Sequence, residues 1–220
     1  MAYKARTAYR NAKIVTEYNK KRFYSLKGRI TDKLEKWVIE KALRHISLPV
    51  KSKILDLPCG TGRISMFLAK KRYVVTGGDI SASMIKEAQG NVCQPNVFYK
   101  TNFKVLDAEK INCQDNYFDA IVSLRFFGHL PPDVRINVLK EFKRVGKRFF
   151  ILAYYLKKCP QEILRRRKRL IAGVHWNPVL LKDVDEEFQQ VGIKRIKVFP
   201  VLRGFSETII VVGESFLKNY

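Results

Sequence analysis

A short apolar run that breaks into a glycine-rich turn and then into a helix constrains this chain more than any other feature. Residues 53–57 are mostly apolar and include a β-branched residue, which predicts a buried strand. The turn Pro-Cys-Gly-Thr-Gly follows at 58–62, and residues 63–69 have helical composition. Glycine lets the backbone approach a ligand closely, and the N–H groups at a helix start favour anionic or polar ligand groups. The order strand, turn, helix therefore predicts the first half of a nucleotide-binding βαβ unit.

A second strand-like run, residues 73–76, leads through two glycines to Asp79. Asp79 lies 23 residues after Asp56, which ends the first run. A carboxylate in this position, at the end of the second strand, can accept both ribose hydroxyls of an adenosine cofactor. The competing interpretation is a nicotinamide-binding Rossmann unit, but its fingerprint Gly-x-Gly-x-x-Gly is absent from residues 58–63.

The remaining chain alternates between helix-like and strand-like segments. Residues 31–46 predict an amphipathic helix capped by Thr31 or Asp32, with Trp37 in the core. Residues 148–155 are almost continuously apolar, as in a strand that is buried on both faces. Further helices are expected at 81–89, 131–146 and 179–190, and further strands within 97–106 and at 120–124, 193–199 and 205–212.

The chain carries a large excess of positive charge. Its 220 residues include 43 Lys and Arg against 20 Asp and Glu, a net charge of +23. Such a surplus favours a polyanionic partner, which could be RNA, an anionic membrane surface or a phosphorylated substrate. Two basic segments stand out, 1–29 and 157–169. Both could instead be solvated faces, and a lysine-rich genome or a thermophilic surface would also explain the charge.

Other features narrow the class of protein. The longest apolar run, 149–156, is too short to span a bilayer, and the basic N-terminus shows no secretory signal. The four cysteines are scattered without a Cys-x-x-Cys pair, which disfavours a zinc site and a disulfide framework. We therefore expect no metal, and a cytoplasmic protein that could associate peripherally with a membrane.

Four segments together resemble the class I S-adenosylmethionine-dependent methyltransferases. Asp-Leu-Pro-Cys-Gly-Thr-Gly at 56–62 is similar to motif I, Asp-x-Gly-x-Gly-x-Gly, except that proline replaces the first glycine. Asp-Ile-Ser-Ala-Ser-Met at 79–84 resembles the acidic ribose-binding segment, and Leu-Asp-Ala-Glu at 106–109 resembles the adenine-binding segment. Residues 118–131 resemble motif IV. The segments fall in the family's order, which makes the resemblance far more specific than one glycine-rich loop.

The resemblance implies an α/β fold, with a Rossmann-like, seven-stranded, mostly parallel sheet, helices on both faces and an antiparallel strand near the C-terminus. It implies one methyltransferase domain over 1–220, with a helical lid or arm at 1–46, a core at 47–213 and a basic substrate-side insertion at 157–178. The implied cofactor is S-adenosyl-L-methionine, and the product is S-adenosyl-L-homocysteine. Oligomeric state stays open.

The resemblance also assigns residues to the site. The cofactor contacts that it implies are Asp56, Pro58, Cys59, Gly60, Gly62, Asp79, Ile80, Met84, Asp107, Ala108 and Leu124. Because proline lacks an N–H, residue 58 cannot donate one to the ligand. Asp107 could alternatively form an Asx turn. Candidate catalytic residues are His129 and Arg125, and candidate substrate-side residues are Tyr18, Arg22, Arg203 and Glu207.

The expected reaction is methyl transfer to a small-molecule or lipid-linked acceptor that is anionic. The His-Leu-Pro sequence at 129–131 resembles that of quinone-type methyltransferases, and His129 could act as a general base or simply cap the next helix. The Asn/Asp-Pro-Pro-Tyr motif of base-amine methyltransferases is absent from this position. The alternatives are an RNA methyltransferase and a non-catalytic protein that binds S-adenosylmethionine.

Overall fold

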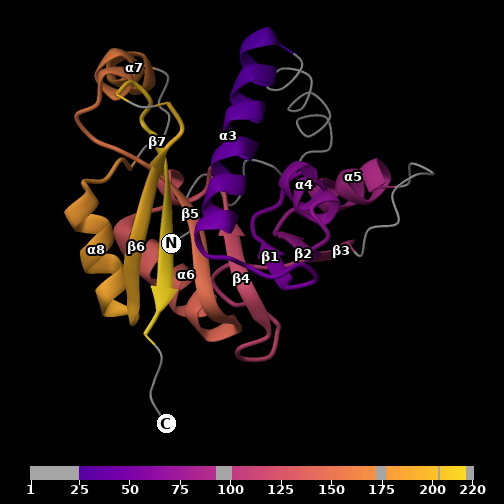
Figure 1. The fold of residues 1–220 in the computed structure, drawn as a ribbon. Helices are drawn as coiled ribbons and strands as arrows, with labels where there is room; N and C mark the ends of the chain where they lie inside the picture. The colour runs from indigo at the N-terminus through magenta and orange to yellow at the C-terminus, as the bar shows by residue number, and fades with distance from the viewer. Residues whose placement is uncertain (1–24, 93–100, 172–176, 203, 217–220) are drawn as a thin grey trace.

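A seven-stranded sheet forms the middle layer of the molecule (Figure 1). The structure, a computed structural model, describes residues 25–92, 101–171, 177–202 and 204–216. The strand order is β3-β2-β1-β4-β5-β7-β6. The strands are β1 (Lys53–Asp56), β2 (Val74–Asp79), β3 (Thr101–Val105), β4 (Phe118–Ser123), β5 (Gly146–Tyr155), β6 (Ile193–Pro200) and β7 (Thr208–Ser215).

The sheet is parallel from β3 to β5, and β7 runs antiparallel to both of its neighbours, β5 and β6. This confirms the predicted mostly parallel Rossmann-like sheet with an antiparallel strand near the C-terminus. The helices are α3 (Leu26–His45), α4 (Arg63–Lys70), α5 (Ala82–Val92), the short 3₁₀ helix η1 (Phe127–His129), α6 (Pro132–Val145), α7 (Pro160–Ile171) and α8 (Leu181–Gln190).

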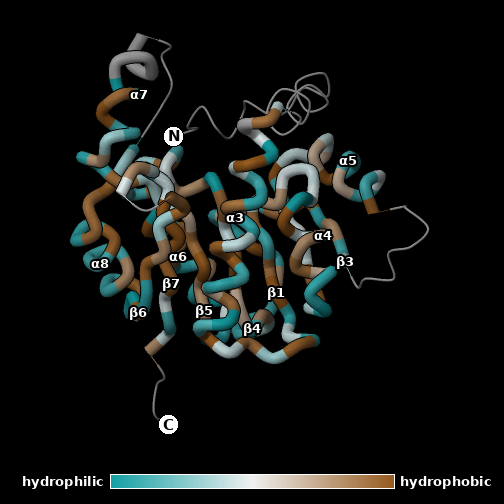
Figure 2. The backbone as a smooth tube through the Cα atoms, turned by 45° about the horizontal axis from the view of Figure 1, so that its top comes forward, coloured by the Kyte–Doolittle hydropathy of each residue, from teal (hydrophilic) through white to brown (hydrophobic). Residues whose placement is uncertain are grey.

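Helices cover both faces of the sheet because its central strands are apolar on both sides. Adjacent residues of a strand point to opposite faces, and Ile54 of β1 packs with α3 and α4 while Leu55 packs with α6 and α8. Helix α5 extends the first face beside α4 (Figure 1). Hydrophilic and hydrophobic residues alternate along α3 and α8, as expected of helices with one buried side (Figure 2).

The direction in which successive strands are added to the sheet reverses between β1 and β4. After β1 the chain passes through α4 to β2, whereas after β4 it passes through α6, on the opposite face, to β5. The loops that follow β1 and β4 therefore leave the carboxyl edge of the sheet in opposite directions. In open α/β sheets, ligands bind in the crevice that such a reversal opens.

Three sequence predictions about elements were wrong in detail. Helix α3 begins at Leu26, not near residue 31, because the side chain of Ser25 accepts the N–H of Gly28 and caps the helix there. Trp37 is 49% exposed rather than in the core, and the ammonium of Lys41 lies over its ring. Strand β7 begins at residue 208 because residues 205–207 continue the turn that follows β6.

Core packing on the α6 face gives a stability prediction. Phe142 of α6 is fully buried and belongs to the cluster between α6, α8 and the sheet. Phe142→Ala removes most of a buried ring and leaves a cavity, so we expect a loss of about 3–5 kcal/mol in the free energy of unfolding. Urea titration followed by circular dichroism measures it. Val50→Ala, at a position that is 56% exposed, should change stability by less than about 0.5 kcal/mol.

Candidate functional site

The glycine-rich turn after β1 holds backbone conformations that favour glycine. Gly60 has φ 55° and Gly62, which precedes α4, has φ 82°. A Cβ on Gly62 would lie 2.9 Å from the ring of Phe103, so the packing of β3 against the turn also requires glycine there. A Cβ on Gly60 would meet no atom within 4 Å. The backbone at Gly60 thus borders open space into which a ligand can fit.

The carboxylate of Asp79 joins the end of β2 to this turn. Its Oδ2 accepts the N–H of Gly60 at 3.0 Å, and its Oδ1 accepts the N–H of Ser81 at 2.9 Å. Burial raises the pKa of Asp79, while these two hydrogen bonds oppose the rise. Each carboxylate oxygen can accept more than one hydrogen bond, so both can also receive hydroxyl groups of a ligand.

Asp56, at the end of β1, is buried beneath the turn. Ser65 of α4 donates its hydroxyl to Oδ2 of Asp56 at 2.6 Å. Burial raises the pKa of Asp56 to about 7, and the hydrogen bond from Ser65 only partly opposes this effect. Asp56 is 1% exposed, so its contribution is to fix the start of α4 against β1 rather than to present an open carboxylate.

The two residues between Leu57 and Gly60 shape the turn. The Leu57–Pro58 peptide bond is cis, and the N–H of Cys59 donates to the carbonyl of Gly78 at 2.7 Å. Burial raises the pKa of the Cys59 thiol, so it is not a nucleophilic thiolate. Pro58 and Cys59 thus align the turn with β2.

The other predicted cofactor residues lie near the same edge. Ser81 accepts the N–H of Met84 and caps α5, which buries Met84, whereas Ile80 is 37% exposed. Asp107 follows β3 and accepts the N–H of Glu109 at 3.0 Å, so it forms the Asx turn that was the alternative to adenine binding. Ala108 and Leu124 are buried after β3 and β4. Their contacts with a cofactor stay predictions.

A cluster of four charged side chains links α3 to the loops after β1 and β4. Glu35, which is 3% exposed, accepts from Arg63 at 2.8 Å and from Arg125 at 2.6 Å. Asp32 also pairs with Arg63. Arg125 lies two residues after the end of β4 and has φ 56°. Sequence reasoning missed Asp32 and Glu35, because an acidic pair on a helix does not reveal its distant partners.

His129 ends the short helix η1, which follows Arg125 at the carboxyl edge. Its half-buried ring lies 6.0 Å from the ring of Tyr155, edge to face. His129 thus follows β4, the strand that pairs with β1. Its catalytic role stays a prediction.

The predicted substrate-side residues are only partly within the described chain. Tyr18, Arg22 and Arg203 lie outside the described residues. Glu207 is 2% exposed, and its carboxylate accepts from Arg165 of α7 at 3.0 Å. The structure therefore uses Glu207 to hold α7, and contact with an acceptor stays a prediction.

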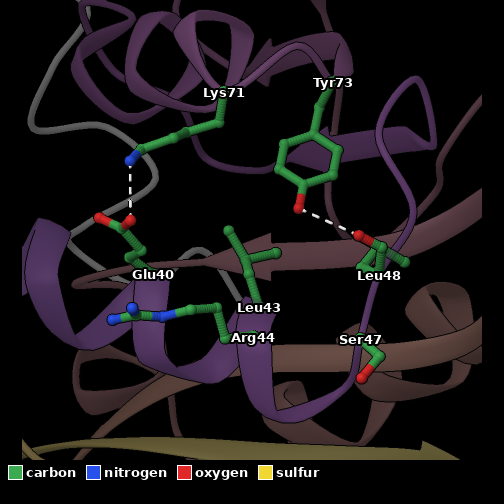
Figure 3. A pocket seen from close by; sticks show the side chains of 7 residues that line it. All are labelled: Glu40, Leu43, Arg44, Ser47, Leu48, Lys71 and Tyr73. Atoms are coloured by element: carbon green, nitrogen blue, oxygen red, sulfur yellow. Dashed lines mark hydrogen bonds and ion pairs between the residues drawn. The ribbon is translucent and has the colours of Figure 1, made fainter.

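A cavity of 420 Å³ lies at the opposite, amino edge of the sheet, where α3 ends and β2 begins (Figure 3). An ion pair between Glu40 and Lys71 crosses it, and Tyr73 donates to the carbonyl of Leu48. No residue predicted for the cofactor or acceptor site lines it. This cavity is therefore separate from the crevice.

The described residues contain no group of three or more His, Cys, Asp or Glu side chains that could hold a metal ion. None of their helices is long and apolar enough to cross a membrane.

Comparison with known proteins matches residues 54–148 to a family described as "Methyltransferase domain". The chain is 42% identical over 120 residues to the candidate methyltransferase YqeM of Bacillus subtilis, a match that covers 52% of this chain and 42% of YqeM. It is 33% identical over 113 residues to the ubiquinone biosynthesis O-methyltransferase of Coxiella burnetii, covering 49% and 47% of the two chains. The chain thus spans less than half the length of these relatives.

A solved structure supports the fold over nearly the whole chain. Magnesium protoporphyrin IX methyltransferase from Synechocystis PCC 6803, crystallised with bound SAH, superposes with a TM-score of 0.74. The match covers 93% of this chain and all of that one, at 18% sequence identity. At this identity the likeness establishes the fold alone.

The buried Asp56 gives a prediction about pH. Its ordinary pKa is 3.8 and its pKa in the folded chain is about 7, so the folded chain binds this proton more tightly than the unfolded chain does. The stabilisation from Asp56 is therefore complete at low pH and is lost as the pH rises through about 7. Between pH 3.8 and about 7, the wild type should lose roughly 1–4 kcal/mol of unfolding free energy relative to Asp56→Asn.

Urea titrations at a series of pH values measure this difference, with Asp119→Asn as the matched control. Burial opposes the shift at Asp119, but hydrogen bonds from Lys147 and the backbone N–H of Lys53 lower its pKa below 3.8. Asp119 is thus ionised in both states above that value, and its variant should show a constant offset from the wild type. A constant offset for Asp56→Asn as well would contradict the raised pKa of Asp56.

Proposed function

We propose that this chain is a class I S-adenosylmethionine-dependent methyltransferase and transfers the methyl group of S-adenosylmethionine to a small-molecule acceptor. One observation carries the proposal most directly. The carboxylate of Asp79 accepts the N–H of Gly60 at the crevice between β1 and β4, so an acidic group and a glycine turn meet where this fold binds ligands.

The residues around the turn fit the cofactor. Asp79 has the position and the acceptor capacity to hold the two ribose hydroxyls, and the open space at Gly60 accommodates a ligand against the backbone. Ile80, exposed just beyond Asp79, offers an apolar surface for the adenine ring. When bound there, S-adenosylmethionine supplies a methyl group already activated by its sulfonium sulfur.

The chain then has mainly to align two reactants. Residues on the β1 and β2 side hold the donor, and residues after β4 face the acceptor across the crevice. Holding the acceptor nucleophile in line with the methyl carbon and sulfur can lower the barrier by roughly 7–11 kcal/mol. His129, which follows β4, is the candidate base for an acceptor whose nucleophile must lose a proton.

The charges of the crevice bear on the character of the acceptor. Arg125 and Arg63 are balanced by Glu35 and Asp32, so this cluster is not a surplus of positive charge. Lys157 and Lys158 follow β5 at the same edge and are exposed, and the ammonium of Lys157 lies 3.8 Å from the carboxylate of Asp183. Lys158 therefore supports an anionic acceptor, whether it is freely diffusing or lipid-linked.

Cofactor binding tests the role of Asp79. Asp79→Ala removes the acceptor of the ribose hydroxyls and of the Gly60 N–H, so we expect S-adenosylhomocysteine to bind roughly 10- to 100-fold more weakly in isothermal titration. Asp119→Ala is the control, because Asp119 lies at the amino end of β4 and bonds to Lys53 and Lys147. Equal affinities for Asp79→Ala and the wild type would refute this cofactor site.

Transfer of labelled methyl groups tests the function as a whole. The wild-type chain, incubated with labelled S-adenosylmethionine and a cell extract, should label the small-molecule or lipid fraction, and Asp79→Ala should lose most of this label. Label in the RNA fraction would support the alternative, an RNA methyltransferase, which the net charge of +23 favours. Cofactor binding without label in any fraction would support a non-catalytic binding protein.

A further inference from the structure

Helix α7 is fastened to the turn between β6 and β7 by polar contacts. The N–H of Gln161 donates to the carbonyl of Phe205, and the side-chain oxygen of Gln161 accepts the N–H of Glu207 at 3.0 Å. Arg165, one helical turn further on, donates to the buried carboxylate of Glu207 at 3.0 Å. The first half of α7 and the turn are therefore one structural unit, which lies beyond the ends of β5 and β7 (Figure 1).

The same contacts decide which side of α7 faces outward. At 3.6 residues per turn, Gln161 and Arg165 lie on one side of the helix and Ile163 lies almost opposite them. Ile163 is 62% exposed and Leu164 is 68% exposed. On the adjoining turn, Leu202 is 48% and Phe205 is 45% exposed. Isolated apolar residues are common on surfaces, but four on two joined segments are not explained by the packing of the described residues.

The exposed charges around these apolar residues are all positive. Lys158 and Arg166 are exposed, and the sequence continues with Arg-Lys-Arg at 167–169. The two acids of the unit, Glu162 and Glu207, are 5% and 2% exposed. Glu162 accepts the N–H of Lys158, and Glu207 pairs with Arg165, so neither presents negative charge outward.

We propose that Lys158, Ile163, Leu164, Arg166, Leu202 and Phe205, together the α7 surface, dock this protein onto an anionic lipid bilayer. Exposed aliphatic and aromatic side chains enter the boundary between headgroups and acyl chains, while lysine and arginine contact the lipid phosphates. RNA would use the same cations, but it gives Ile163 and Leu164 no apolar surface to enter. Because β5 leads from the carboxyl edge into α7, docking would bring the crevice close to the bilayer.

Cosedimentation of the full chain with vesicles tests the proposal. Vesicles of equal parts phosphatidylglycerol and phosphatidylcholine should bind the wild type, and vesicles of phosphatidylcholine alone should bind it weakly. Ile163→Ser combined with Leu164→Ser should weaken binding to the anionic vesicles roughly tenfold or more. Arg166→Gln should weaken it at low salt, and added salt should diminish that difference.

Two exposed positions far from α7 serve as matched controls. Val50→Ser removes an apolar side chain that is 56% exposed, and Lys70→Gln removes an exposed charge at the end of α4. Neither should change vesicle binding. Titration with S-adenosylhomocysteine shows whether each variant remains folded, since none of these residues belongs to the cofactor site.

Three outcomes would overturn the proposal. The first is a wild type that does not bind anionic vesicles, and the second is a double variant that binds them as well as the wild type does. The third is tight binding of polyuridylic acid that Arg166→Gln weakens but the apolar substitutions leave unchanged, since the α7 surface would then be a track for RNA phosphates. Failure of methyl transfer would refute the proposed function and leave the vesicle result standing.

Discussion

The hydrogen bond from the N–H of Gly60 to the carboxylate of Asp79 is the contact on which the proposed site depends. It fixes the turn after β1 to the end of β2, and the N–H of Ser81 holds the same carboxylate from the other side. Beneath it, Asp56 receives the hydroxyl of Ser65 and anchors the start of α4. Two buried carboxylates thus set the backbone of the cofactor crevice before any ligand arrives, which lowers the entropic cost of binding.

The charged cluster on α3 connects the start of α4 to the loop after β4. Glu35 pairs with Arg63, the first residue of α4, and with Arg125, which lies in the loop after β4. The carboxylate of Glu35 is buried, so losing either arginine would leave its desolvation cost only partly offset. Glu35 therefore holds the start of α4 and the loop after β4 together through its two ion pairs. Helix α3 is therefore part of the site's framework, and its partners explain why charged residues interrupt its buried side.

Local patterns were sufficient to place most helices and strands, and they failed where a distant contact decided the outcome. The apolar runs of β1 and β5 and the turn at Gly60 are visible in the sequence because burial and positive φ restrict residue type locally. The start of α3 was missed because Ser25 precedes a segment with little apolar periodicity. Trp37 was placed in the core from its spacing, yet the packed side of α3 is set by Val38 and Ile39.

The sequence by itself determined the elements of the proposed cofactor site: a strand, a glycine turn, a helix and an acid at the next strand end must meet at one edge of a parallel sheet. Only the tertiary structure decided which charged side chains are left without an oppositely charged neighbour and which are paired. Glu207 pairs with Arg165, and Arg125 pairs with Glu35, because residues 42 or more positions apart come together only when the sheet forms. Residue type reveals a charge, but the three-dimensional fold determines whether a neighbour neutralises it.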